Sequence, residues 1–432
     1  MYIFSWNYIK EKWANDGFQK YFKNTGWLFA SRILCMCIAF ITTAFIARKL
    51  GPESFGQLSY AVSFVSIFAI LASLGMENIL YRDLIKNPDK KREILGSGIT
   101  IKLVAGLFTA ILVSISALLW AENDVSKILI LILSGTFVFN AFQIISFEFQ
   151  ARAKSKYPSI ISFFVTLILN SLKILVVLGG KGVIYLAFIL LLESILYAVF
   201  YWFIYEKKIE GSIYEWKFNK DIAKKLLLDS WPLIFTSAFV LIYSRIDQIF
   251  IKNMMGAHSV GIYDSAVRIA EVWYFIPGII VGSLFPAIIN AKKTSEALYY
   301  ARLKKLSLTL LILGVIIALP VTIFAPFIMN IIYGHAFVEG TIILQIYVWA
   351  CIGTFLGILT DNYLITENYK NILIFRSLIP MITNIILNII WIPKYGIVGS
   401  AYATLISYSL GPLTLLLFKK TRINLIQIIK SV

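Results

Sequence analysis

Charged side chains occur in an apolar stretch, residues 230–278, where a segment embedded in lipid would carry none. Apart from Lys252, they are Arg245, Asp247, Asp264, Arg268 and Glu271. An ionisable side chain near the bilayer centre costs about 2.5–3.5 kcal/mol on insertion scales, so it faces a protein interior or a wet cavity. Asp264, Arg268 and Glu271 follow the spacing i, i+4, i+7, which places them on one face of a helix. Such a stripe can line a polar pathway, or it can be an internal ladder of ion pairs that only joins helices.

The composition indicates that these helices lie in a membrane. Of 432 residues, 59% are hydrophobic and only 15% are charged, and the mean hydropathy is +0.80. Soluble domains carry about 25% charged residues. The net charge of +17 would suggest a nucleic-acid partner in a soluble protein. In a membrane protein it follows from basic residues kept on the cytoplasmic side, so we expect no nucleic-acid partner.

Apolar runs of membrane-spanning length recur along the whole chain. A span needs about 20 mostly apolar residues. This rule predicts an all-α integral membrane protein with about twelve transmembrane helices, at residues 25–47, 57–81, 97–120, 126–149, 158–179, 183–205, 229–251, 261–289, 304–326, 341–365, 371–393 and 396–418.

Basic residues gather in alternate connections of these helices. They lie within residues 82–92, 152–156, 207–225, 292–305, 370–376 and 419–430. The positive-inside rule then places both termini in the cytoplasm. Residues 1–24 combine aromatic and basic side chains and predict an interfacial amphipathic segment. All outer connections are short, which leaves no room for a separate catalytic module, so we do not expect an enzyme.

An internal repeat divides the chain into two lobes. Residues 50–61 (LGPESFGQLSYA) match residues 255–266 (MGAHSVGIYDSA) at an offset of 205, and Gly182 and its neighbours match Gly396 at a similar offset. Two parallel copies of six helices are a plan of secondary transporters. The predicted divisions are an N-terminal segment, a six-helix lobe, a basic cytoplasmic linker, a second six-helix lobe and a cytoplasmic tail, at 1–24, 25–205, 206–228, 229–418 and 419–432.

Two further charges lie inside predicted helices. Arg32 is about two turns into the first helix, where it can face a pathway or reach back to the cytoplasmic surface. Glu193 lies near the middle of the sixth helix without an evident local partner, so we expect it to face inward. No metal-ligand spacing and no phosphate-binding loop pattern occurs in the sequence, and no cofactor is expected.

Two long stretches resemble a known family. NTGWLFASRILCMCIAFITTAFIARKLGPESFGQLSYA and YSRIDQIFIKNMMGAHSVGIYDSAVRIAEVWYFIP are similar to segments of bacterial polysaccharide repeat-unit flippases of the Wzx (O-antigen exporter) type. These belong to the multidrug/oligosaccharidyl-lipid/polysaccharide exporter (MOP) superfamily. The resemblance covers essentially the whole chain. It implies alternating access in the bacterial inner membrane, for lipopolysaccharide or related polysaccharide biosynthesis, with a cavity between two lobes.

The resemblance also implies roles for the charged residues. The cargo would be an oligosaccharide on a polyprenyl diphosphate, usually undecaprenyl diphosphate, and polysaccharide polymerase machinery is an expected partner. Arg32, Arg245 and Arg268 would bind the diphosphate, because guanidinium groups offer forked hydrogen bonds to phosphate. Asp247, Asp264, Glu271 and Glu193 would hold the arginines or take up the coupling ion, H⁺ or Na⁺. Pro277 and Gly278 would form a hinge.

Two other functions remain open at this point. A cation-coupled multidrug exporter of the same superfamily would favour an acidic cavity, whereas bases are frequent inside these helices. A membrane glycosyltransferase or O-antigen polymerase usually carries large external loops, which this sequence lacks.

Overall fold

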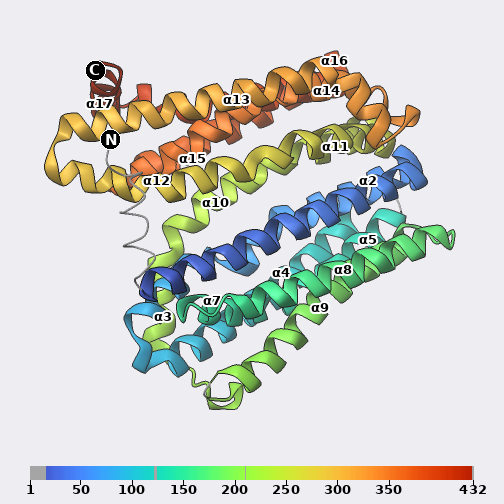
Figure 1. Ribbon diagram of the computed structural model, residues 1–432. Coiled ribbons are helices and arrows are strands. Elements are labelled where there is room, and N and C mark those ends of the chain that lie inside the picture. The colour runs from blue at the N-terminus through green and yellow to red at the C-terminus, as the bar shows by residue number, and fades with distance from the viewer. Residues whose placement is uncertain (1–15, 121–123, 210, 431–432) are drawn as a thin grey trace. The chain divides into compact units, whose positions relative to one another are not determined.

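The computed structural model describes residues 16–120, 124–209 and 211–430 (Figure 1). Within these ranges the chain forms helices and no strands, as predicted. Up to the middle of the chain the elements are α2 (Asp16–Ser73), α3 (Glu77–Lys86), η1 (Pro88–Lys90), α4 (Lys91–Trp120), α5 (Asp124–Ser134), α6 (Thr136–Phe139), η2 (Asn140–Gln143), α7 (Ile144–Ala151), α8 (Lys156–Leu178), α9 (Val183–Lys208) and η3 (Ile213–Glu215). The remaining elements are α10 (Lys220–Met255), α11 (Ala257–Glu271), η4 (Val272–Tyr274), α12 (Phe275–Thr294), α13 (Glu296–Ile332), η5 (His335–Phe337), α14 (Gly340–Tyr347), α15 (Ala350–Thr366), α16 (Lys370–Leu413), η6 (Thr414–Leu416) and α17 (Lys419–Lys430).

The described residues contain ten helices that are long and apolar enough to cross a membrane. Two of them include a glycine with non-helical geometry, Gly51 in α2 (φ 74°) and Gly396 in α16 (φ 61°). Glycine adopts a positive φ without the steric cost of a side chain. Dividing these two helices at their glycines yields the twelve predicted segments. The protein is therefore a multi-pass membrane protein.

The predicted boundaries differ from the observed ones in several places. The segment predicted at 126–149 is built from α5, α6, η2 and α7, and the segment at 341–365 from α14 and α15. The predicted interfacial segment falls largely on residues 1–15, outside the described residues, and its remainder begins α2.

The chain separates into two compact units. Among the described residues, the first contains those within 16–46 and 68–234, and the second those within 47–67 and 235–430. The divisions fall within α2 and α10, so each of these two helices contributes residues to both units. The two six-helix lobes read from the sequence remain a prediction.

In the first unit α8 packs along α9, and α4 packs along α5 (Figure 1). The predicted basic linker 206–228 is ordered in the residues described. The Asn219 side chain accepts hydrogen bonds from the backbone N–H groups of Asp221 (3.0 Å) and Ile222 (3.3 Å). This caps α10 and satisfies N–H groups that have no partner within the helix, so α10 begins inside the linker.

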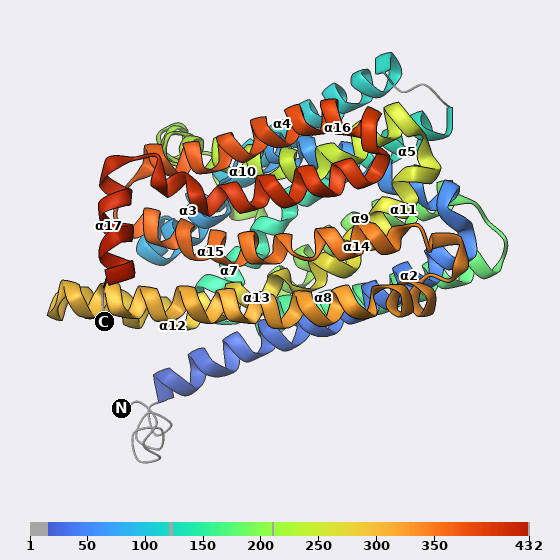
Figure 2. The same cartoon turned by 90° about the horizontal axis from the view of Figure 1, so that it is seen from above.

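In the second unit α12 lies beside α13, and α15 packs along α16 (Figure 2). The predicted helix 261–289 is interrupted by the 3₁₀ turn η4. Pro277 follows in the first turn of α12 and is buried, whereas Gly278 is exposed. A proline lacks the N–H that a first turn leaves unpaired, so it fits there without losing a hydrogen bond.

The two copies of the junction motif touch each other within the second unit. A methyl group added at Gly56 would lie 1.8 Å from the carbonyl oxygen of Ala257, and one added at Gly261 would lie 2.0 Å from that of Pro52. Both glycines therefore permit a backbone approach that no side chain allows. Since 56 and 261, and 52 and 257, differ by the repeat offset of 205, the two contacts are equivalent.

Candidate functional site

A buried carboxylate on α11 organises the first polar cluster. Asp264 is 1% exposed, and its Oδ1 accepts a hydrogen bond from Nε2 of Gln248 on α10 (2.8 Å). Its Oδ2 accepts one from the Ser59 hydroxyl on α2 (2.7 Å). Ser63, one turn further along α2, donates to Oε1 of Gln248 (2.6 Å). Three helices therefore converge on one carboxylate, which neutral hydrogen bonds fix in position.

Arg268 is oriented by this carboxylate. Its Nε lies 2.6 Å from Asp264 Oδ2, one helical turn earlier, and its guanidinium lies 5.5 Å from the centre of the Phe55 ring. The Arg268 side chain is 36% exposed, whereas that of Asp264 is 2% exposed. A charge-assisted bond to a buried carboxylate is strong and directional. The arrangement therefore presents a guanidinium at the edge of the helical core in a fixed position.

Arg245 and Glu271 form a second ion pair across α10 and α11. Arg245 Nη2 lies 3.2 Å from Glu271 Oε2, and the side chains are 31% and 21% exposed. Tyr347 on α14 donates its hydroxyl to the other Glu271 oxygen (3.2 Å). The predicted stripe of Asp264, Arg268 and Glu271 is thus divided: Glu271 pairs with Arg245 on the neighbouring helix.

Asp247 lies on another face of α10 from Arg245, as their two-residue spacing requires. It is 2% exposed. Its Oδ2 accepts hydrogen bonds from the hydroxyls of Tyr263 (2.8 Å) and Thr404, and its Oδ1 accepts one from Nδ2 of Asn388 (2.8 Å). In the described part of the chain no Lys, Arg or His forms an ion pair with it. Asp247 is therefore a buried carboxylate held by neutral donors alone.

A second layer of polar groups on α16 supports this carboxylate. Ser400 donates to Oδ1 of Asn388 (2.7 Å), and Asn384 lies one turn before Asn388 and accepts from it (3.2 Å). Asn384, Asn388, Ser400 and Thr404 are all buried. The sequence analysis did not single out these residues, although two asparagines at i, i+4 in an apolar helix are a visible signal of a polar interior face.

The structure changes the expectation for Glu193. It lies on α9 and is paired with Lys173 of α8, with Nζ and Oε2 3.3 Å apart, so it has the local partner that the sequence did not reveal. The sequence did not reveal this partner because the two residues lie on adjacent antiparallel helices, twenty positions apart in the chain. Arg32 lies on α2 in the first unit, and its side chain is exposed.

A further ion pair could not be seen in the sequence. Arg376 was counted among the basic residues that mark the cytoplasmic side, yet it lies within α16, is 8% exposed and pairs with Asp361 of α15 at 2.7 Å. A methyl group at Gly357 would lie 2.3 Å from Arg376 Nη2. Gly357 thus provides the space that lets the guanidinium turn inward, and no sequence spacing indicated it.

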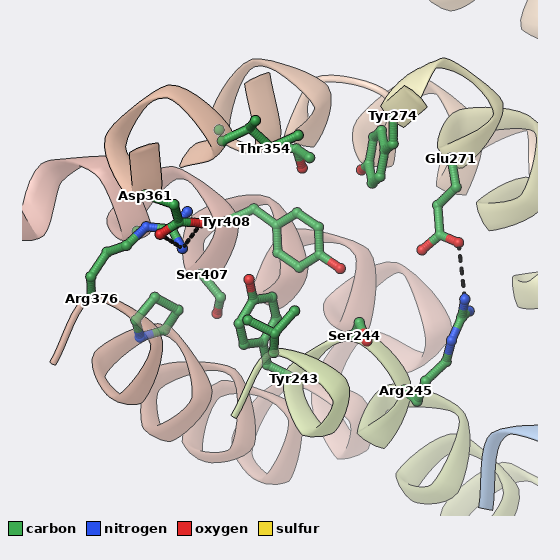
Figure 3. Close-up of a pocket in the computed structure, with 15 residues that line it drawn as sticks. Tyr243, Ser244, Arg245, Glu271, Tyr274, Thr354, Asp361, Arg376, Ser407 and Tyr408 are labelled. Carbon is green, nitrogen blue, oxygen red and sulfur yellow. Dashed lines mark hydrogen bonds and ion pairs between the residues drawn. The ribbon is translucent and has the colours of Figure 1, made fainter. Parts of the chain in front are cut away.

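Two of these ion pairs line a cavity in the second unit. It has a volume of about 300 Å³, and its walls include both ion pairs, Arg245–Glu271 and Asp361–Arg376, and the tyrosines Tyr243, Tyr274 and Tyr408 (Figure 3). Within the described residues, no cluster of three or more His, Cys, Asp or Glu side chains is suited to a metal ion. The polar groups described in this unit are arginines, carboxylates, amides and hydroxyls.

Comparison with curated proteins identifies relatives over nearly the whole chain. The chain is 22% identical to the capsular polysaccharide biosynthesis protein CapF of Staphylococcus aureus, over 89% of this chain and 96% of CapF. It is 25% identical to Agl15 of Haloferax volcanii, described as a probable low-salt glycan biosynthesis flippase, over 89% of this chain and 80% of Agl15.

Solved structures share the fold. An inward-facing MATE family multidrug resistance transporter of the MOP superfamily superposes with a TM-score of 0.73 at 13% identity, covering 92% of this chain and 96% of the transporter. The lipid II flippase MurJ in an inward closed conformation gives 0.70 at 19% identity, covering 95% and 90%. The all-α membrane fold that the resemblance to the MOP superfamily implies is thereby confirmed.

The sequence also matches the family described as polysaccharide biosynthesis protein, over residues 21–292, which is more than half of the chain. This agrees with the resemblance seen in the two long sequence stretches, which lie entirely within the matched region. The chain belongs to the polysaccharide biosynthesis protein family.

Proposed function

We propose that this protein is a flippase that moves polyprenyl-diphosphate-linked oligosaccharides from the cytoplasmic to the outer leaflet by alternating access. Family membership and a relative described as a glycan biosynthesis flippase support this function. We place the protein in the bacterial cytoplasmic membrane with both termini inside, as the distribution of basic residues predicts. It acts as a transporter rather than an enzyme, and its cargo is of the undecaprenyl diphosphate type.

One observation carries the proposal: the guanidinium of Arg268 is fixed by a buried carboxylate and still partly exposed. Among the described residues it donates only Nε–H to Asp264, so its Nη groups remain for a ligand. A diphosphate that leaves water loses strong hydration, and forked hydrogen bonds from a positioned guanidinium offset that loss. If the Asp264–Arg268 ion pair only joined helices, the Arg268 side chain would not need to be more than a third exposed.

Arg245 and Arg32 complete the proposed diphosphate-binding set. Arg245 donates a hydrogen bond from Nη2 to Glu271. Arg32 is exposed on α2. Glu271 and Asp264 hold Arg245 and Arg268 of the second unit in place. In the first unit, Glu193 holds Lys173 in the same way. Polysaccharide polymerase machinery would receive the cargo on the outer side.

Asp247 is the proposed coupling residue. A fully buried carboxylate with only neutral donors is unstable as a bare anion, because its desolvation is not repaid by a nearby charge. It is stabilised by taking up a proton or by binding a monovalent cation together with the amide and hydroxyl oxygens around it. Uptake and release of H⁺ or Na⁺ at Asp247 would then be linked to the conformational change.

The hinge is proposed at η4 and the start of α12. A short 3₁₀ segment within an otherwise α-helical stretch often marks a hinge. Pro277 and Gly278 follow in the first turn of α12, where Pro277 has no N–H to link α12 to η4 and Gly278 makes the helix easier to bend.

Loss of the gene, followed by analysis of lipid-linked intermediates, tests the proposed function. Complete oligosaccharide units retained on the cytoplasmic leaflet are the expected result. Unpolymerised units already on the outer leaflet would instead indicate a polymerase. Normal polysaccharide with a lost resistance to cationic drugs would indicate a multidrug exporter.

A further inference from the structure

The cavity in the second unit has two polar ends and an aromatic middle. Figure 3 shows Arg245 and Glu271 at one end, Asp361 and Arg376 at the other, and the tyrosine rings between them. Its volume of about 300 Å³ is at the lower limit for small-ligand pockets. A site of this size accommodates one small polar group rather than an extended chain.

The aromatic middle consists of Tyr243, Tyr274 and Tyr408. The Tyr243 and Tyr408 rings meet edge to face with centres 5.1 Å apart, and Tyr274 and Tyr408 are tilted at 6.3 Å. All three tyrosines line the cavity, so their rings can contact a ligand in it. Aromatic faces favour ligands with a flat patch of C–H groups, which is an apolar contact in an otherwise polar site.

The serine and threonine hydroxyl groups in the wall can accept hydrogen bonds more readily than they can donate them. Ser244, Thr354 and Ser407 each donate their proton to a backbone carbonyl of their own helix, at 3.1, 3.2 and 2.7 Å. Each hydroxyl has one proton and two lone pairs, so only lone pairs remain for a ligand. The ligand must therefore supply several O–H or N–H donors.

Arg376 adds an unused donor at the far end. Its Nε–H is buried without a hydrogen-bond partner in the described part of the protein, and the buried Tyr274 hydroxyl is in the same position. Buried polar groups are nearly always paired, so these two indicate that a further polar group completes the site. The ion pairs leave the cavity with two positive and two negative groups, which favours an uncharged ligand.

We propose that this cavity binds the sugar ring nearest to the diphosphate of the cargo. A hydroxyl-rich, uncharged pyranose combines the required donors with a C–H face for the tyrosines, and its ring and hydroxyl oxygens accept from Arg376 and Tyr274. The inference rests on the proposed function through Arg245, which lies in the cavity wall and in the proposed diphosphate-binding set. A saccharide joined to a diphosphate held at Arg245 extends into the cavity.

The test compares two lipids binding to the full-length protein in detergent. One is synthetic undecaprenyl diphosphate without sugar, and the other is lipid-linked oligosaccharide extracted from the cells that make this protein. We expect the wild type to bind the sugar-bearing lipid about 10-fold more tightly. Tyr408→Leu should remove most of that difference and leave the affinity for the bare lipid unchanged, whereas Tyr408→Phe, which keeps the ring, should retain it.

A paired variant and a surface control complete the design. Asp361→Asn with Arg376→Gln removes both charges together, so that neither is left unpaired, and should also reduce binding of the sugar-bearing lipid only. Tyr395→Leu, at a tyrosine of α16 that is 61% exposed, should change neither affinity. Equal wild-type affinities for the two lipids, or equal weakening of both by Tyr408→Leu, would overturn the proposed sugar site. Failure to bind either lipid would overturn the proposed function as well.

Discussion

Ser59 donates a 2.7 Å hydrogen bond to Asp264, although 205 residues separate them. This separation equals the repeat offset, so the two residues occupy the same position in the two copies of the junction motif. Together with the close approaches at Gly56 and Gly261, the hydrogen bond shows that the two copies pack against each other. Residues of both copies therefore hold the carboxylate that orients Arg268. Only the second copy has a charged residue at this position, because the first has Ser59 there.

The glycines at this contact should be intolerant of any side chain. Gly56→Ala and Gly261→Ala each place a methyl group about 2 Å from a backbone carbonyl of the other copy. Overpacking typically costs about 1–3 kcal/mol, and here a flexible side chain cannot move aside because the obstacle is backbone. Thermal unfolding in detergent should show lower stability for both. Gly282→Ala on α12, where nothing lies within 4 Å of the added methyl, is the control and should not be destabilised.

The Asp264–Arg268 pair should be required for export. Arg268→Ala alone leaves a buried carboxylate without its cation, which typically costs about 3–5 kcal/mol and would confuse folding with function. The double variant Asp264→Asn, Arg268→Gln avoids this, and we expect normal membrane levels with surface polysaccharide abolished. Lys181→Ala, at an exposed lysine between α8 and α9, should leave surface polysaccharide unchanged. Normal export by the double variant would mean that the pair only joins helices.

Asp247→Asn should uncouple transport from the ion gradient. The amide keeps the size of the carboxylate and can still accept hydrogen bonds, but it cannot bind a proton or neutralise a cation. In liposomes with an imposed H⁺ or Na⁺ gradient, the variant should transport no faster than without a gradient. Glu339→Gln, at an exposed carboxylate just before α14, is the control and should respond to the gradient as the wild type does. A gradient response in Asp247→Asn would assign coupling to another group.

Stiffening the start of α12 should slow transport without lowering stability. Gly278 is exposed, and a methyl group there would touch nothing within 4 Å. Alanine stabilises a helix by about 1 kcal/mol relative to glycine, so Gly278→Ala should unfold no earlier than the wild type. Its transport rate should fall because the bend becomes harder to change. Equal rates for Gly278→Ala and the wild type would place the hinge elsewhere.

The membrane helices were predictable because a span needs a long apolar run. The charged site residues were predictable because a charge in lipid has a high free-energy cost. Arg245, Asp247, Asp264, Arg268 and Glu271 stand out against that apolar background. The break at η4 was partly visible in the proline that follows it. The division of α16 was visible as well, because Gly396, read as a turn residue, has non-helical geometry between two helical stretches.

The partners of these charges could not be predicted, because they come from distant helices and most are neutral. Gln248 and Thr404 are common residues whose role depends on which face of the helix they occupy. Arg376 was misplaced because a base near a helix end usually lies in the connection. Its burial depends on the missing side chain of Gly357 on another helix, a relation that only packing reveals.

The most direct test of the central claim is translocation in proteoliposomes. Purified protein is reconstituted with lipid-linked oligosaccharide, and the fraction of saccharide that becomes accessible to an added glycosidase is followed over time. The account predicts that the wild type exposes saccharide initially shielded in the inner leaflet, whereas the Asp264→Asn, Arg268→Gln variant behaves as protein-free liposomes do. A wild type indistinguishable from empty liposomes, or a double variant as fast as the wild type, would contradict it.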